Sequence, residues 1–414
     1  MSSSLSAPHL SASSPAHSLR WVAVGVFILS STLNYLDRNL LSTLAPLIMA
    51  EFAFNQTGFG FLLSAFSISY AAASLFVGWF LDRVGVNRGI SAAVGWWSAA
   101  AVASGLTGGF RAFAICRVAL GIGESAGVPA VGKLNGTYLQ PEERALGAAL
   151  NQVGLSLGQI LAPLWIAVAY RYSWRTPFVI VGALGFVWIP LWWAVSSRIK
   201  PAFPEYPESR PRSSVRLLLD RNLILLVIAN ILWMGAYSLW SSWTTLYLTR
   251  VQGITLQQSA KYVWIPMLVS NAGAFFGGWL SKRWARRTGQ PIPARCRAIW
   301  WSAAGMLLTL LLPFAHGPGW ATAVISVSFF FNLSGSVNIY ALPIDLYGAA
   351  RSGLAISSLV FAFGILQTFI SPVIGYLADH KLYTAVVWMV ALPPVMSALV
   401  LTRIAGASQA EIAN

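Results

Sequence analysis

The sequence predicts an all-α polytopic membrane protein with about twelve transmembrane helices in two pseudo-symmetric halves of six. Hydrophobic residues make up 57% of the 414 residues and charged residues only 9%, far below the roughly 25% of a soluble domain. Apolar runs long enough to cross about 30 Å of hydrocarbon as helices recur along the chain. The stretch GWFLDRVGVNRG (78–89) returns as GWLSKRWARRTG (278–289), which indicates an internal repeat.

Each half contains six apolar runs. The runs of the first half cover 20–48, 57–80, 87–109, 111–134, 145–170 and 175–197. The runs of the second half cover 221–249, 257–281, 295–314, 318–343, 352–378 and 383–404. A polar stretch rich in Pro, Ser and Arg separates the halves. The expected organisation is a disordered cytoplasmic tail (1–18), an N-terminal bundle (19–197), a cytoplasmic linker (198–219), a C-terminal bundle (220–404) and a cytoplasmic tail (405–414).

The net charge of +15 is explained by its position along the chain. In the predicted topology most Lys and Arg residues lie in the loops and chain ends on the cytoplasmic side, in agreement with the positive-inside rule. Both termini are therefore expected in the cytoplasm. The expected location of the protein is the plasma (bacterial inner) membrane. A nucleic-acid partner is not expected, because no segment combines basic charge with a soluble fold.

The chemistry of an enzyme is not expected either. No metal-ligand cluster, nucleotide-binding loop or nucleophile–base set is recognisable in the sequence. Two cysteines, Cys116 and Cys296, indicate no disulfide framework. We therefore predict no metal and no cofactor.

Four charges interrupt the predicted spans: Asp37, Arg38, Arg117 and Glu124. Each costs about 2.5–3.5 kcal/mol at the centre of a membrane helix, and such residues usually mark a transport pathway. The alternative is a set of structural ion pairs between helices. We favour the functional interpretation, with Arg38 and Arg117 binding an anion, because a guanidinium pairs bidentately with a carboxylate and stays charged when desolvated.

Helical geometry refines this interpretation. Arg117 and Glu124 lie about two turns apart on one helix face, and Gly121 lies between them. Gly121 either leaves room for a ligand or lets two helices pack closely. Asp37 and Arg38 point roughly 100° apart, so that one faces a cavity while the other contacts a neighbouring helix.

Coupling to protons requires a group that titrates, and the four histidines fall in the tail or in loops. A carboxylate buried in an apolar region can perform this task. Glu124 is the first candidate for the proton-coupling residue and Asp37 the second. Permanent pairing of Asp37 with an arginine of another helix is an equal alternative.

Further polar and aromatic residues within the spans are candidates for substrate binding. They are Tyr35 and Tyr70 in the first half and Tyr237, Trp240 and Asn338 in the second. Their side chains can contact carboxylate or hydroxyl groups. Helix packing and interfacial anchoring are the alternatives. Asn338 precedes Pro343 in a span that we expect to be bent.

Two motifs resemble those of the major facilitator superfamily. Its G-x-x-x-D-R-x-G-x-x-R signature is matched by Gly78, Asp82, Arg83, Gly85 and Arg88. Its R-x-x-x-G-x-G pattern is matched from Arg117 to Gly123. The stretches NYLDR, RVALGIGESAGVPA and WRTPFVIVGALGF resemble more narrowly the anion:cation symporter branch, which includes hexuronate, galactonate and glucarate importers.

The resemblance implies roles for particular residues. Asp82 and the arginines of its motif would form interhelical contacts that hold an inner gate shut. Tyr70 stands where the sugar-acid importers also have a tyrosine. Two positions depart from the family: Lys282 replaces an Asp in the second copy of the loop motif, and Phe361 stands where an Asn is common.

The combined expectation is a monomeric secondary active transporter that works by alternating access. It would carry protons together with a small organic anion, namely a sugar acid such as a hexuronate or aldonate. Its partners would be that anion, protons and the lipid bilayer. The alternatives are an exporter or antiporter of the same fold, and a membrane sensor built on a transporter scaffold.

Overall fold

The computed structural model describes residues 15–140, 143–199, 215–348 and 352–413, and the regular elements in these ranges are all helices. The α-helices of the first half are α1 (Pro15–Glu51), α2 (Gln56–Val84), α3 (Val86–Gly105), α4 (Phe110–Glu124), α5 (Gly127–Tyr138), α6 (Arg144–Leu161), α7 (Trp165–Arg171) and α8 (Arg175–Ser196). Those of the second half are α9 (Arg221–Arg250), α10 (Leu256–Ser259), α11 (Trp264–Thr288), α12 (Pro291–Met306), α13 (Pro318–Tyr347), α14 (Ser352–Asp379), α15 (Tyr383–Ala391) and α16 (Pro393–Ala413). Short 3₁₀ helices cover Ala162–Leu164, Val215–Leu219 and Leu307–Phe314.

The predicted membrane fold is confirmed. Among the described residues, 11 segments are long and apolar enough to cross a membrane. The remaining expected span corresponds to α3, whose 20 residues also reach about 30 Å. Its Ser and Gly residues and its Asn87-Arg88 start make it less apolar than the other spans. α3 packs against α4 and α8, so that it completes the first bundle.

Several helix ends differ from the expected boundaries. α1 begins at Pro15, inside the predicted tail 1–18, and residues 1–14 of that tail lie outside the described residues. Residues 200–214 of the predicted linker also lie outside them. α16 continues to Ala413, although a tail was expected from residue 405. Helical hydrogen bonding thus extends beyond the apolar runs from which the boundaries were predicted.

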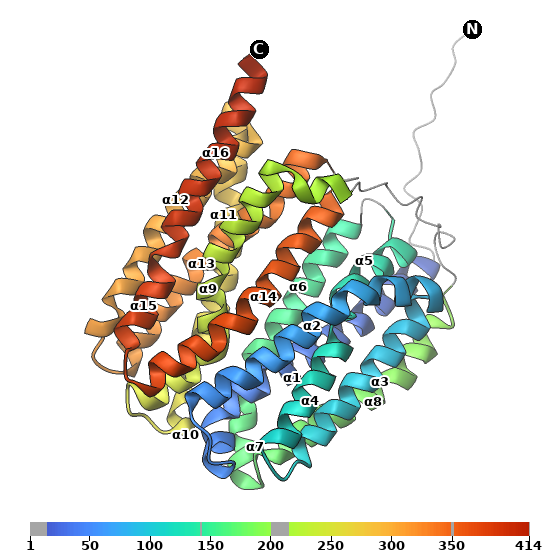
Figure 1. Cartoon of the computed structure of the whole chain (residues 1–414). Helices are drawn as coiled ribbons and strands as arrows, with labels where there is room; N and C mark the ends of the chain where they lie inside the picture. The colour runs from blue at the N-terminus through green and yellow to red at the C-terminus, as the bar shows by residue number, and fades with distance from the viewer. Residues whose placement is uncertain (1–14, 141–142, 200–214, 349–351, 414) are drawn as a thin grey trace.

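The two halves lie side by side, with the first half in blue to green and the second in yellow-green to red (Figure 1). They meet where α2 packs on α14, α1 on α9, and α6 on α11. Because each half forms its own bundle, the interface is where a ligand site is expected in this architecture.

The chain reversals between helices have specific caps. Asn55 accepts a hydrogen bond from the Gly58 amide (3.0 Å) at the start of α2, and Asp220 caps α9 by accepting from two amides. Gly85, at φ +84°, joins α2 directly to α3, a conformation that favours glycine. The family motif around residue 80 therefore lies on a tight helix–helix turn.

At one end of the molecule, α2 and α14 approach closely enough to exclude side chains. A Cβ added at Gly60 would lie 2.4 Å from the Ser371 carbonyl oxygen, and one at Gly375 would lie 2.3 Å from that of Gln56. In Figure 1 the two helices come together toward the ends where α2 begins and α14 ends. Farther along α2, a Cβ added at Gly78 would meet nothing within 4 Å.

Asp379 holds this closed end together. Its carboxylate accepts hydrogen bonds from the Gln56 amide (2.9 Å), the Thr57 amide (2.9 Å) and the Thr57 hydroxyl (2.6 Å). These groups form the first turn of α2, where free amides and the helix dipole favour a negative charge. The last turn of α14 in one half is thus bound to the first turn of α2 in the other.

We predict that Asp379→Asn weakens this closure. Charge-assisted hydrogen bonds contribute about 1.5–3 kcal/mol, so the ratio of closed to open molecules should fall by about tenfold or more. Spin labels at exposed Leu106 and Lys381, which flank this end in different halves, would report a new, longer distance by pulsed electron paramagnetic resonance. Asp345→Asn, in a pair with Arg295 inside the second half, is the control and should leave the distance unchanged.

Candidate substrate and coupling site

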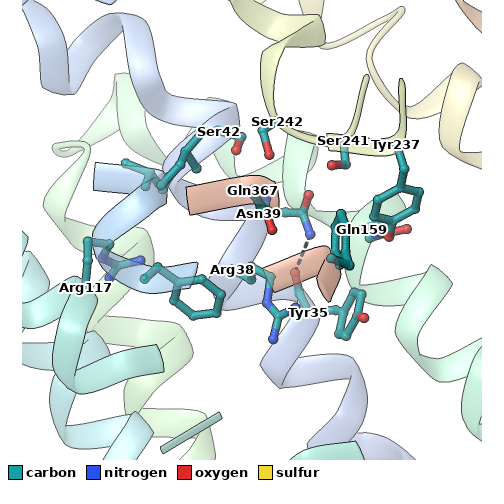
Figure 2. Close-up of a pocket in the computed structure, with 14 residues that line it drawn as sticks. Tyr35, Arg38, Asn39, Ser42, Arg117, Gln159, Tyr237, Ser241, Ser242 and Gln367 are labelled. Atoms are coloured by element: carbon teal, nitrogen blue, oxygen red, sulfur yellow. Dashed lines mark hydrogen bonds between the residues drawn. The ribbon is translucent and has the colours of Figure 1, made fainter. Parts of the chain in front are cut away.

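A cavity lies between the two halves, with a volume of about 70 Å³, several times the roughly 10–15 Å³ that one water needs. It is lined by Tyr35, Arg38, Asn39, Leu41, Ser42, Leu63, Phe66, Arg117, Gln159, Tyr237, Ser241, Ser242, Phe363 and Gln367. These residues come from α1, α2 and α4 and from α6, α9 and α14. In Figure 2, Arg117 lies at one side of the cavity, Gln159 and Tyr237 at the other, and Arg38 between them.

Arg38 is the central cation of this cavity. Its Nε and Nη2 donate hydrogen bonds of 3.0 and 2.8 Å to Oε2 of Glu124, a side chain with no exposed surface. The guanidinium lies over the rings of Tyr35 (4.8 Å), Phe66 (4.8 Å) and Tyr70 (5.1 Å). Such contacts stabilise a desolvated cation. They also position Arg38 without covering it, because 28% of its side chain stays exposed.

Arg117 reaches the cavity from α4 and is only 1% exposed. Its Nη2 donates to Ser104 Oγ at 2.6 Å, and its guanidinium lies over the rings of Phe113 (5.0 Å) and Phe178 (5.4 Å). The Nε of Arg117 has no hydrogen-bond partner among the described residues. A buried donor without a partner is costly, so this atom is available to an acceptor that enters the site.

Both carboxylates also keep unused acceptor atoms. Asp37 is 2% exposed and Glu124 is 1% exposed. Within the described part of the chain, Oδ1 of Asp37 and Oε1 of Glu124 have no hydrogen-bond partner. A free, buried carboxylate oxygen is a place where a proton or a water can bind. Neither carboxylate lines the cavity itself, but both interact electrostatically with Arg38 and Arg117, which do.

The glycine between the α4 charges packs against a helix. A Cβ at Gly121 would lie 2.2 Å from Ser69 Oγ and 2.5 Å from the Phe66 carbonyl oxygen of α2. Gly121 thus permits close contact of α4 with α2, which is the packing alternative of the sequence analysis. This contact brings Phe66 and Tyr70 next to the charges of α4.

The structure brings together most of the sequence-predicted binding residues. Tyr35, Arg38, Arg117 and Tyr237 line the cavity. Tyr70 lies beside it, where it contacts Arg38 and lines a small hollow with Glu124.

Two predicted binding residues are not among those that line this cavity. Trp240 is 1% exposed and donates from Nε1 to Ser328 Oγ (2.9 Å), and it lines a small neighbouring hollow together with Gln159, Ser241 and Ser242. Asn338 is fully buried and donates to the carbonyl oxygens of Gly277 (3.1 Å) and Ser334 (2.9 Å). Both side chains join helices within the second half, because a buried polar group there finds its partner in the adjacent helix.

The neutral polar residues of the cavity are not among those predicted from the sequence. They are Asn39, Ser42, Gln159, Ser241, Ser242 and Gln367. Gln159 donates from Nε2 to the Tyr237 hydroxyl at 3.2 Å, which joins the halves across the cavity. Gln367 is the polar lining residue from α14, whereas Phe361 on the same helix is 39% exposed. The sequence signal that could have identified Gln159 and Gln367 as cavity residues is the presence of single glutamines within apolar runs.

The motif around residue 80 makes contacts within the first half. Asp82 forms an ion pair with Lys133 of α5, and Arg83 lies 5.7 Å from the ring of Trp79. Arg88 is exposed at the start of α3. The interhelical contact expected of Asp82 is therefore present, and it lies inside one bundle.

A match to a family model over most of the chain shows the family. Residues 27–341 match the sequence model of a family described as "Major Facilitator Superfamily". The chain belongs to the major facilitator superfamily. Its fold agrees, because a bacterial homolog of the human lysosomal transporter Spinster, solved in an inward-facing and unoccupied conformation, superimposes with a TM-score of 0.72. That pair is 18% identical and covers 94% of this chain and 96% of the other.

Sequence relatives are bacterial transporters of organic acids. The hexuronate transporter of Escherichia coli K12 is 24% identical over 404 residues, which cover 92% of this chain and 93% of the relative. A probable sulfoacetate transporter of Cupriavidus necator is 26% identical and covers 87% of this chain and 88% of its own length. A D-galactonate transporter of Escherichia coli O6:H1 is 24% identical, with coverage of 87% and 89%. The resemblance to the anion:cation symporter branch is thus confirmed.

We predict that Arg38→Met lowers the free energy of unfolding by about 3–5 kcal/mol, because it leaves Glu124 buried without its cation. A titration with sodium dodecyl sulfate in mixed micelles would measure this loss. Arg175→Met is the matched control, since Glu51, its partner, is 42% exposed, and a loss near 1 kcal/mol or less is expected. Arg38→Met combined with Glu124→Gln should recover part of the loss. Equal losses for the two arginine variants would contradict the importance of the buried pair.

Proposed function

We propose that this protein is a proton-coupled symporter of a small organic anion that works by alternating access. The observation that carries the proposal is the Arg38–Glu124 pair at the wall of the central cavity. Arg38 faces the cavity and is bound to a fully buried carboxylate. A substrate anion and Glu124 would therefore compete for the same guanidinium.

This competition provides a mechanism of coupling. A proton that binds to Glu124 converts its carboxylate to a neutral carboxyl group, which binds a guanidinium more weakly than the ion does. The Nε and Nη2 donors of Arg38 are then free for the substrate carboxylate. Proton binding and anion binding favour each other in this scheme, and the net charge of the loaded site equals that of the empty site for a monovalent anion.

Asp37 and Arg117 support the same scheme. Arg117 offers an unused Nε donor to the anion, while Asp37 offers an unused carboxylate oxygen to a second proton or to a water. Asp37 is the neighbour of Arg38 in the sequence, so any movement of α1 displaces both charges together. We assign Glu124 as the main coupling residue and Asp37 as the secondary one.

The neutral part of the cavity favours a sugar acid as the substrate. Besides the arginines, the amides of Gln159 and Gln367 and the hydroxyls of Tyr237, Ser241 and Ser242 line the cavity. Amides and hydroxyls both donate and accept, which suits the hydroxyl groups of an aldonate or hexuronate. A short acid without hydroxyls would leave these groups without partners, at a cost for each buried group.

Alternating access fits the closure at the Asp379 end. In the predicted topology this end is extracellular, so the described conformation would be the one that releases substrate to the cytoplasm. The open space beside Gly78 at the other end is where α14 would pack in the opposite conformation. One chain supplies both halves of the site, so a monomer suffices for transport.

We predict that an inward proton gradient drives uptake of labelled D-glucuronate or D-galactonate into proteoliposomes. One pH unit supplies about 1.4 kcal/mol per proton, which supports up to about tenfold accumulation for one proton. Glu124→Gln should abolish this accumulation and retain exchange of labelled for unlabelled substrate, because the amide cannot carry the proton.

Glu51→Gln, at the end of α1 and outside the cavity lining, is the matched control and should accumulate substrate as the unchanged protein does. Transport of the acids without any response to the gradient would contradict the symport mechanism. Gradient-driven efflux would favour an antiporter instead.

We predict that Gln159→Leu and Gln367→Leu reduce selectivity for hydroxylated acids. Each lost hydrogen bond contributes about 1 kcal/mol, so the ratio of D-galactonate to sulfoacetate uptake should fall by about fivefold per variant. Competition of the two unlabelled acids with labelled substrate would measure this ratio. Gln257→Leu, exposed on α10, is the control. A protein that prefers sulfoacetate before any substitution would contradict the sugar-acid assignment.

A further inference from the structure

A second, larger cavity lies outside the transport site, as a groove on the surface of the first half. Its volume is about 580 Å³, and it runs between α2, α3 and α4. These three helices lie next to one another in Figure 1. The groove is almost wholly apolar, and its lining residues Phe76, Trp79 and Trp96 are 69%, 59% and 54% exposed. Because these helices cross the membrane, this surface faces the acyl chains of the bilayer.

Small residues create the groove. Ala72 and Ala73 of α2 and Ala92 and Ala93 of α3 face it, where large apolar side chains would otherwise fill the surface. Gly123 of α4 also contributes, since a Cβ there would lie 2.7 Å from Trp96 Cδ1. The Trp96 indole donates from Nε1 to the Ala119 carbonyl oxygen (2.7 Å), which fixes the ring as one wall.

The groove lies on a face of α2 that does not pack against the second half. Gly60 and Ser64 contact α14, and at helical spacing this face continues through Ala71 to Gly78. Phe76 lies about 160° around the helix from Gly78, so it points away from that face. α2, α3 and α4 also belong to one bundle. The groove should therefore persist while the halves move.

Two arginines stand at one end of the groove. The guanidinium of Arg83 lies 5.7 Å from the ring of Trp79, a residue that lines it. Arg88 is exposed one turn before Ala92 on α3, on the same side of that helix. The nearby carboxylate of Asp82 is already paired with Lys133. The end of the groove is thus positively charged, while its length is apolar.

We propose that this groove binds an anionic phospholipid, with an acyl chain between α2, α3 and α4 and the phosphate held by Arg83 and Arg88. Charge complementarity identifies the occupant, because an apolar chain that ends in a phosphate matches an apolar groove that ends in two guanidinium groups. The site is separate from the transport cavity. It would hold the α2–α3 turn, which carries the family motif, at the membrane surface.

The test uses the full chain in nanodiscs with equal amounts of phosphatidylglycerol and phosphatidylcholine, followed by native mass spectrometry of the lipids that stay bound. The unchanged protein should retain phosphatidylglycerol preferentially. Arg83→Ala with Arg88→Ala should lower that preference by about 30-fold, since each arginine contributes about 1 kcal/mol near an anionic lipid. Ala72→Phe with Ala92→Phe should displace the bound lipid of either kind, because the rings fill the groove.

Matched controls separate this site from general attraction. Arg286→Ala with Arg287→Ala removes the same charge from the exposed end of α11, and Ala304→Phe adds a ring to an exposed position of α12. Both should retain phosphatidylglycerol as the unchanged protein does. The proposal would be overturned if the control arginine variant lost its phosphatidylglycerol preference equally, or if Ala72→Phe with Ala92→Phe retained the lipid. A dimer in place of bound lipid would also overturn it. Transport activity does not enter this measurement.

Discussion

The ion pair between Arg38 and Glu124 is the interaction on which the organisation of the first half depends. The side chain of Glu124 has no exposed surface, so its charge must be balanced inside the protein. The pair joins α1 to α4, and the rings of Phe66 and Tyr70 bring α2 to the same point. The helices that make the substrate wall are therefore positioned by the same charges that would bind the substrate and the proton.

α4 connects the separate parts of the molecule because its faces have different tasks. Arg117 and Glu124 point to the charged site, and Gly121 packs against α2. Gly123 packs against Trp96 of α3 and helps to form the outer groove. A single helix thus separates a polar cavity from a lipid-facing surface. The glycines allow α4 to pack closely against both neighbouring helices of the first bundle.

The halves contact each other mainly where α2 packs on α14, with smaller contacts of α1 on α9 and of α6 on α11. The Asp379 carboxylate and the close approach at Gly60 and Gly375 hold one end, and the Gln159–Tyr237 hydrogen bond crosses the cavity. Buried apolar side chains of both halves also pack together, as where the rings of Phe59 and Trp243 lie 4.9 Å apart. The proposed alternating access would require the bundles to exchange these contacts while they move as units around a site to which both contribute.

The sequence by itself determined the membrane fold, the two halves and the charged residues of the site, because spans of apolar residues and the cost of a buried charge leave strong signals in the chain. It placed Arg38, Arg117 and Tyr237 at one cavity. Only the tertiary structure decided that Gln159 and Gln367 face this cavity while Trp240 and Asn338 bind neighbouring helices. A polar residue in a span has the same appearance in the sequence whether it faces a ligand or a backbone carbonyl, and the rotation of each packed helix makes the difference.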